Sequence, residues 1–102
     1  MDIIPEPLKF EWDKGNIDKN VKKHGITNEN AEKIFLEEKS IFSEDIKHSK
    51  IEKRYQILGE SRKGQVLSVV FTIRNEKVRI ISARQANQKE RKLYETKNKK
   101  TK

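Results

Sequence analysis

Glu52 and Arg54 are the residues whose types and spacing most directly suggest chemistry. They alternate with Ile51, Tyr55 and Ile57 in a stretch that should form a strand, so both should project from its polar face. A carboxylate on such a face can act as a general base, and an arginine can bind a phosphate through two parallel hydrogen bonds. The alternative is the polar face of an edge strand that meets only solvent.

Two further arginines occupy positions that the requirements of folding do not explain. Arg79 interrupts an apolar strand, and Arg84 is expected in the first turn of a helix, where the helix dipole disfavours a cation. Surface arginines are the simplest alternative for both. Glu90 lies on the apolar stripe of the same helix, between Ala86 and Leu93, and a buried carboxylate should meet an arginine. We interpret that pairing as structural rather than catalytic.

Lys23 and His24 form a third candidate pair, nearer the N-terminus. Imidazole exchanges protons near neutral pH, which suits acid–base chemistry, and the neighbouring ammonium group could neutralise a phosphate or its transition state. His24 also follows Ile17 and Val21 at helical spacing, so a core or helix-capping histidine is the alternative. Tyr94 is expected to pack rather than to stack on a base.

The composition argues against several other chemistries. There is no cysteine, and the two histidines, His24 and His48, lack ligand spacing, so we expect no zinc site. No glycine-rich phosphate loop and no Ser-His-Asp pattern occurs, so no cofactor is expected. The net charge is +8, and seven of the 24 basic residues but only two of the 16 acidic residues lie from Lys89 to Lys102. This excess favours phosphate-bearing partners such as nucleic acid, with a solubilising tail as the alternative.

The elements that must position these residues begin with a short strand. Leu8–Asp13 alternates apolar and polar residues. Asp13 or Asn16 can cap a helix that ends at Gly25, and Thr27 can cap a second helix. The inward stripe of that second helix consists of Ala31, Ile34 and Phe35.

The second half of the chain predicts an antiparallel meander followed by a helix. Residues 37–50 are charged and poorly periodic and should form a loop, with Ile41, Phe42 and Ile46 against the core. Ser82–Gln85 fits a capping box and should open the C-terminal helix. The strands expected between these two segments are Ile51–Leu58, Val66–Ile73 and Lys77–Ile81.

The 102 residues allow one domain. The order β-α-α-β-β-β-α predicts an α+β fold with two N-terminal helices, a small antiparallel sheet and one C-terminal helix. We place the domain at residues 1–96 and a flexible basic tail at residues 97–102. No apolar run approaches the roughly 20 residues that span a bilayer, and the N-terminus lacks a signal peptide, so we expect a soluble, cytoplasmic protein.

Taken in order, these residues resemble the signature of a known family, the BrnT toxins. The similar segments are Phe10-Glu11-Trp12-Asp13, Asn20-Val21-Lys22-Lys23-His24-Gly25, Glu52-Lys53-Arg54-Tyr55, Gly59, Arg79-Ile80-Ile81-Ser82-Ala83-Arg84 and Glu90-Arg91-Lys92-Leu93-Tyr94. Asn28 departs from the pattern, because the family often has an aromatic or apolar residue there. The lysine-rich tail lies outside it.

The resemblance implies a RelE-like ribonuclease fold and a toxin that cleaves RNA without a metal. It also implies a BrnA-like antitoxin, through which the complex would bind its operator DNA. Carried over by position, the candidate catalytic residues are Lys23, His24, Glu52, Arg54, Arg79 and Arg84.

In such a site the RNA 2′-hydroxyl would attack the neighbouring phosphate. Glu52 or His24 could be the base, while Arg54, Arg79 and Lys23 stabilise charge. The residues by themselves leave base and acid unassigned. They also leave open a non-catalytic nucleic-acid-binding domain and a protein-interaction domain.

Overall fold

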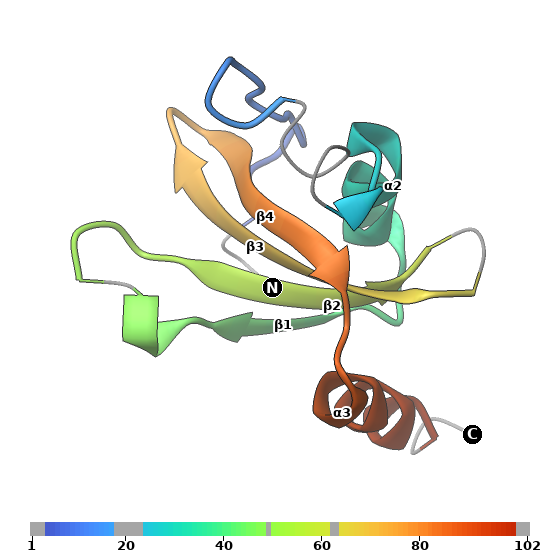
Figure 1. Cartoon of the computed structure of the whole chain (residues 1–102). Helices are drawn as coiled ribbons and strands as arrows, with labels where there is room; N and C mark the ends of the chain where they lie inside the picture. Colours follow the sequence, from blue (N-terminus) through green and yellow to red (C-terminus); the bar gives the residue numbers. More distant parts are fainter. Residues whose placement is uncertain (1–3, 18–23, 49, 62–63, 100–102) are drawn as a thin grey trace.

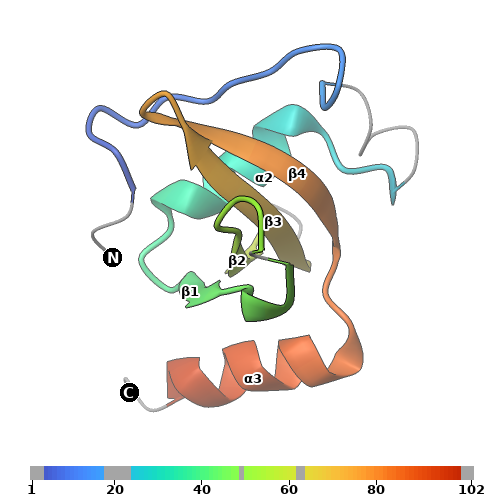
Figure 2. The same ribbon diagram turned by 90° about the vertical axis from the view of Figure 1, so that its left-hand side faces the viewer.

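The computed structural model describes residues 4–17, 24–48, 50–61 and 64–99, which form a four-stranded antiparallel sheet in the order β1-β2-β3-β4. Helix α2 lies over one face of the sheet and helix α3 over the other (Figures 1 and 2). The predicted α+β class with an antiparallel meander is therefore confirmed. The elements are α2 Asn28–Lys33, the 3-10 helix η1 Ile34–Leu36, β1 Ile41–Glu44, the 3-10 helix η2 Ile46–His48, β2 Tyr55–Glu60, β3 Val66–Arg74, β4 Lys77–Gln85 and α3 Gln88–Lys99.

The sheet separates two clusters of buried apolar side chains. Val69 and Phe71 of β3 belong to the larger cluster, which includes Ile34 from the α2 side. Val66 and Leu58 belong to the smaller cluster, which includes Tyr94 of α3. Because successive residues of a strand point to opposite faces, β3 has to be apolar on both, as its sequence predicts.

The elements on the α2 side of the sheet form where the local sequence pattern predicts them. The hydroxyl of Thr27 accepts a hydrogen bond from the backbone N–H of Asn30 at 3.1 Å, so the predicted cap is confirmed. Ala31 and Ile34 are buried as expected. Strand β2 passes so close to η1 that a Cβ atom on Gly59 would stand 2.7 Å from the Cβ of Ile34, so only glycine fits there.

The expected loop at residues 37–50 is wrong in part, because it contains strand β1. Ile41 pairs with Leu58 and Phe42 with Ile57 along the edge of β2. Phe42 packs against the larger cluster, but Ile46 is 79% exposed and contributes to neither. A four-residue strand is too short to show a period in sequence, so the available edge of β2 determines it.

The expected strand at Leu8–Asp13 is reduced to one parallel bridge between Phe10 and Val78. Besides the backbone hydrogen bonds of this bridge, Asn16 holds the segment, and its side chain is buried. The amide of Asn16 donates to the carbonyl oxygens of Glu11 (3.0 Å) and Ile80 (3.1 Å). The helix predicted after Asn16 falls mostly on residues 18–23, outside the described residues. Its expected end, Gly25, has the left-handed φ of 70°.

The helix predicted to open at Ser82 begins six residues later. Strand β4 continues to Gln85, which pairs with Leu67 of the long strand β3. The capping box that forms uses Asn87 and Glu90, whose side chains each accept the other's backbone N–H, at 2.8 and 2.9 Å. Sequence alone cannot separate the two capping patterns, because the choice depends on how far β4 pairs with β3.

Helix α3 is anchored on the sheet by the carboxylate of Glu90. Both terminal nitrogens of Arg84 donate to it, at 2.8 and 3.0 Å, and the amide of Gln56 donates at 2.8 Å. The expectation that Glu90 meets an arginine is confirmed. Leu93, expected on the inward stripe, is 47% exposed, whereas Tyr94 is buried as predicted.

The far end of α3 also differs from the sequence-based expectation. The helix runs to Lys99, past residue 96, the predicted end of the domain. The side-chain amide of Asn98 donates to the backbone oxygen of Lys39 at 3.3 Å. Residues 97–99, which the sequence predicts to belong to the basic tail, therefore continue α3, and residues 100–102 lie outside the described residues.

Replacing Glu90 should destabilise the protein. Glu90→Ala leaves Arg84, Gln56 and the N–H of Asn87 without their shared acceptor, at a cost of about 1–3 kcal/mol in the free energy of unfolding. The loss stays below that of a fully buried pair, since the side chain of Arg84 is 39% exposed. Urea denaturation measures it, with Glu95→Ala on the exposed side of α3 as the control. Equal unfolding curves for the two variants would contradict this assignment.

The same carboxylate should make stability depend on acid pH. Burial opposes ionisation of Glu90, but hydrogen bonds from Arg84, Asn87 and Gln56 outweigh it and lower the pKa below the usual 4.5. As pH falls below that value, Glu90 is protonated in the unfolded chain before it is protonated in the folded protein. The free energy of unfolding therefore decreases until the pH has passed the folded-state pKa. Between neutral pH and about pH 3, Glu90→Gln should lose less thermal stability than the wild type. Parallel pH profiles of the melting temperature would refute the linkage.

Candidate active site

Arg54 and Arg84 lie together at a cleft of about 470 Å³ on the open part of the α3 side of the sheet. Strands β2, β3 and β4 form its floor, and the end of β1 with η2 forms its rim. The described residues that line it are Glu44, Asp45, Ile46, Lys47, Arg54, Gln56, Val70, Ile81, Ser82 and Arg84.

A bulge in β4 shapes the floor of this cleft. Val70 of β3 pairs with Ser82 and Phe71 with Ile80, so the register shifts there and Ile81 is the extra residue of the bulge. Ile81 and Ser82 both line the cleft as a result. The bulge also changes the alternation of β4, so that Arg79 before it and Arg84 after it project from the same face of the sheet, away from the larger core cluster.

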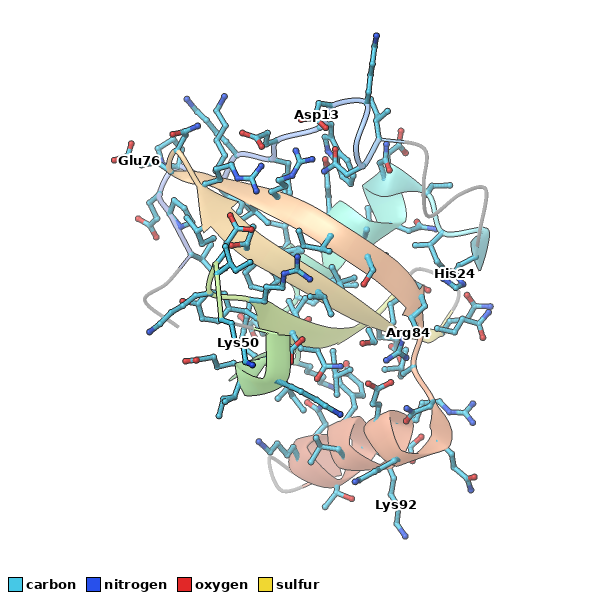
Figure 3. All side chains as sticks on the ribbon, turned by 60° about the vertical axis from the view of Figure 1, so that its left-hand side comes forward. Asp13, His24, Lys50, Glu76, Arg84 and Lys92 are labelled. Atoms are coloured by element: carbon cyan, nitrogen blue, oxygen red, sulfur yellow. The ribbon has the colours of Figure 1, made fainter. Side chains whose placement is uncertain are left out.

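Arg84 stands on β4, not in the first turn of a helix as expected. The paired hydrogen bonds with Glu90 raise the pKa of Arg84, although partial burial acts in the opposite direction. Figure 3 shows Arg84 between the end of β4 and the first turn of α3. Glu90 therefore fixes a permanently charged guanidinium at the wall of the cleft.

Arg54 and Glu52 precede β2 and do not share a strand face, so that part of the prediction is wrong. Ile51, expected in the core, is fully exposed. Two backbone carbonyl groups of this segment accept hydrogen bonds. The carbonyl of Arg54 accepts from the backbone N–H of Asp45 at 2.8 Å, and the carbonyl of Lys53 accepts from the hydroxyl of Thr72 at 2.7 Å. Strand pairing thus starts only at residue 55.

Glu52 and Arg54 nevertheless remain neighbours at a second, smaller pocket. This pocket has a volume of about 330 Å³ and is lined by Lys47, Lys50, Ile51, Glu52 and Arg54. Lys47 and Arg54 border both hollows, so the two are adjacent. The carboxylate of Glu52 is bound by Arg74, with an Nη2–Oε2 distance of 3.0 Å.

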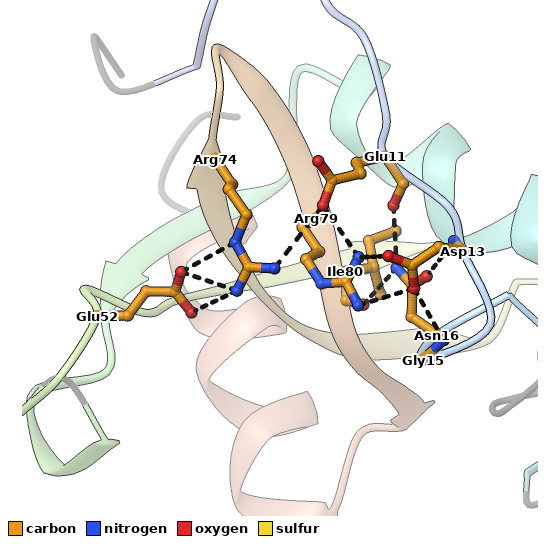
Figure 4. Close-up of polar contacts among 8 residues, drawn as sticks. All are labelled: Glu11, Asp13, Gly15, Asn16, Glu52, Arg74, Arg79 and Ile80. Carbon is orange, nitrogen blue, oxygen red and sulfur yellow. Dashed lines mark hydrogen bonds and ion pairs between the residues drawn. The ribbon is translucent and has the colours of Figure 1, made fainter.

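Arg79 is enclosed by carboxylates from the N-terminal segment (Figure 4). Asp13 accepts from both of its terminal nitrogens, at 2.9 and 3.0 Å, and Glu11 accepts at 3.0 Å. Hydrogen bonding to Asp13 raises the pKa of Arg79, and the same contact lowers the pKa of Asp13. The side chain of Arg79 is 12% exposed, so the alternative that it is a surface arginine is wrong. Its contacts with Asp13 and Glu11 hold the N-terminal segment on β4.

His24 and Lys23 are not brought to the cleft by the described structure. His24 is exposed on the segment before α2 (Figure 3), which excludes the core histidine, and it does not line either hollow. Lys23 lies outside the described residues. Direct roles for both stay predictions.

Gln56 and Lys47 are members of the cleft that the sequence did not single out. Gln56 lies on the face of β2 opposite Ile57, so the alternation of that strand contains the signal for it. Its amide bridges Ser68 and Glu90, both at 2.8 Å. Lys47 belongs to η2, in the segment expected to be loop, and no sequence pattern marks it.

Such a cleft can bind a phosphodiester. Two guanidinium groups and an ammonium group provide charge-assisted donors, and the hydroxyl of Ser82 adds a neutral one. In the ranges that the structure describes, no three histidine or carboxylate side chains gather as ligands for a metal ion. Among the same residues, no helix has the length and apolar content that crossing a bilayer requires.

Comparisons with known proteins agree with this geometry. Residues 12–90 match the family described as ribonuclease toxin, BrnT, of type II toxin-antitoxin systems. The crystal structure of the Brucella abortus ribonuclease toxin BrnT superposes with a TM-score of 0.59 at 25% sequence identity, over 79% of this chain and 99% of that one. The comparison with curated proteins found no match.

The family match includes all six candidate residues, from Lys23 to Arg84. It implies an RNA substrate and an antitoxin partner. The chain therefore belongs to the BrnT family of ribonuclease toxins of type II toxin–antitoxin systems.

Proposed function

We propose that the protein cuts RNA in the cleft between Arg54 and Arg84, by attack of the RNA 2′-hydroxyl and without a metal ion. The observation that carries this proposal is the pair of arginines on the open face of the sheet, one of them held in place by Glu90. Cations fixed before the substrate arrives can stabilise the charge that develops on a phosphoryl oxygen.

The proposed reaction exchanges one phosphate ester for another. The 2′-oxygen bonds to phosphorus, the bond from phosphorus to the 5′-oxygen breaks, and the leaving oxygen gains a proton. Arg54 and Arg84 bind the phosphoryl oxygens, with Lys47 beside them at the rim. No external oxidant or cofactor is needed for this balance.

Glu52 or His24 takes the proton of the 2′-hydroxyl in this proposal. Glu52 is supported by its position in the pocket adjoining Arg54, and its contact with Arg74 orients the carboxylate. Lys23 is proposed as a further cation at the substrate. Arg79 is proposed to act through the N-terminal segment that it holds, since its guanidinium already has two carboxylate partners.

The proposed setting is the cytoplasm, with a BrnA-like antitoxin as the partner. In the arrangement that the family resemblance implies, the antitoxin also carries the complex to operator DNA. The RelE-like character of the fold remains part of the same proposal, as does a domain at residues 1–96 with a basic tail at residues 97–102, into which α3 extends as far as Lys99.

Arg54→Ala should abolish RNA cleavage while leaving the protein folded. Loss of one preorganised charge donor lowers turnover by about 100-fold or more. Lys53→Ala is the matched control, since Lys53 is an exposed neighbouring cation outside the cleft. Cleavage of a labelled RNA, with thermal melts of both variants, measures the effect. Wild-type cleavage by Arg54→Ala would exclude this cleft as the active site.

The products should identify the nucleophile. Attack by the 2′-hydroxyl leaves 2′,3′-cyclic phosphate and 5′-hydroxyl ends, and cleavage should persist in excess chelator. End-group analysis of the fragments distinguishes them from 5′-phosphate ends, which an activated water would leave. Either 5′-phosphate ends or complete inhibition by the chelator would contradict the mechanism.

A further inference from the structure

Two isoleucines near the cleft are the most exposed large apolar side chains in the described part of the chain. Ile51 is 102% exposed and Ile46 is 79% exposed. Neither belongs to the two buried clusters. Single exposed aliphatic side chains are ordinary, but two on one short segment beside a functional cleft indicate a contact surface.

Both isoleucines lie at the entrance to Arg54. Ile46 lines the rim of the larger cleft, and Ile51 lines the adjoining pocket. Lys47 and Arg54 border both hollows, so the two isoleucines flank one continuous entrance. Figure 3 shows Lys50 on the same segment, beside η2. A partner seated on these isoleucines would cover the way to the arginines.

The charges around the entrance restrict the kind of partner. The smaller pocket has three cations, Lys47, Lys50 and Arg54, and its carboxylate, Glu52, is bound by Arg74. The larger cleft adds Arg84 and two carboxylates, Glu44 and Asp45, which precede Ile46, so the cationic side of the entrance is the one around Lys47 and Lys50. RNA matches the cations but not the isoleucines, because unpaired bases stack on aromatic or guanidinium planes. A protein segment with an apolar side chain between acidic ones matches both features.

We propose that the antitoxin docks on Ile46 and Ile51 and silences the toxin by covering the cleft. The occupant is a segment that places an apolar side chain on the isoleucines and acidic side chains on Lys47 and Lys50. This inference rests on the proposed function, because covering the entrance inhibits the toxin only if RNA is cut in the cleft.

Leu36 offers a matched control for this surface. It is 72% exposed, but it lies on η1, lines neither hollow and is followed by Glu37 and Glu38. A substitution there changes a similarly exposed aliphatic side chain in acidic surroundings. Ile51→Asp and Leu36→Asp therefore differ in location and not in the kind of change.

The test titrates full-length toxin with the purified antitoxin from the neighbouring gene, by calorimetry. Ile51→Asp removes the apolar contact and repels an acidic partner, so its affinity should fall about tenfold or more. Ile46→Asp should weaken binding in the same direction, and Leu36→Asp should bind like the wild type. With each toxin compared with its own cleavage rate in the absence of antitoxin, more antitoxin should be needed to inhibit Ile51→Asp than to inhibit the wild type.

Two outcomes would overturn the docking surface. They are unchanged antitoxin binding by Ile51→Asp and an equal loss of affinity in Leu36→Asp. An absence of RNA cleavage by the wild-type protein would instead refute the proposed function, and the affinities would still decide where the antitoxin binds.

Discussion

The carboxylate of Glu90 fastens helix α3 to strands β2 and β4 of the sheet. It accepts hydrogen bonds from the backbone of Asn87, from both terminal nitrogens of Arg84 and from the amide of Gln56. Helix α3 and strands β2 and β4 therefore meet at one ion. These bonds offset the partial removal of the charge from water, which would otherwise be unfavourable. They also orient Arg84 and Gln56, so the contact that docks the helix shapes the wall of the cleft.

Arg79 and Arg84 show how two arginines on one strand face acquire different roles. Both make paired hydrogen bonds to a carboxylate, but the side chain of Arg79 is 12% exposed and that of Arg84 is 39% exposed. Asp13 and Glu11 surround Arg79 and fasten the N-terminal segment to the sheet. Arg84 keeps a surface toward the cleft. The difference comes from where the carboxylates lie, since the bulge in β4 turns both arginines to the same side.

The segment at the entrance to the cleft differs from the ion-paired regions around Arg79 and Arg84, because it packs little and much of its surface is exposed. Backbone groups, such as the carbonyl of Lys53, help to fix the segment between β1 and β2. Two of its side chains, those of Ile46 and Ile51, are exposed to contacts from outside the chain. These isoleucines and the cations beside them are the features on which the proposed antitoxin surface rests.

The sequence by itself determined the features that depend on local pattern or on the rules of burial. The two-sided apolar strand β3, the cap at Thr27 and the left-handed Gly25 are each specified by a few adjacent residues. The pairing of Glu90 with an arginine follows because a carboxylate on an inward stripe needs a partner. The α+β order of elements follows from the same periodicities.

Tertiary structure decided what depends on distant pairing. Two capping patterns compete at Ser82 and Asn87, and the nine-residue strand β3 selects the second by pairing with β4 to its end. β1 exists because β2 offers it an edge. The position of Arg84 at the cleft depends on the same extension of β4 and on its bulge. The enclosure of Arg79 depends on carboxylates 66 and 68 residues away. Local sequence patterns contain no information on such contacts, because their energy exists only after the chain has folded back on itself.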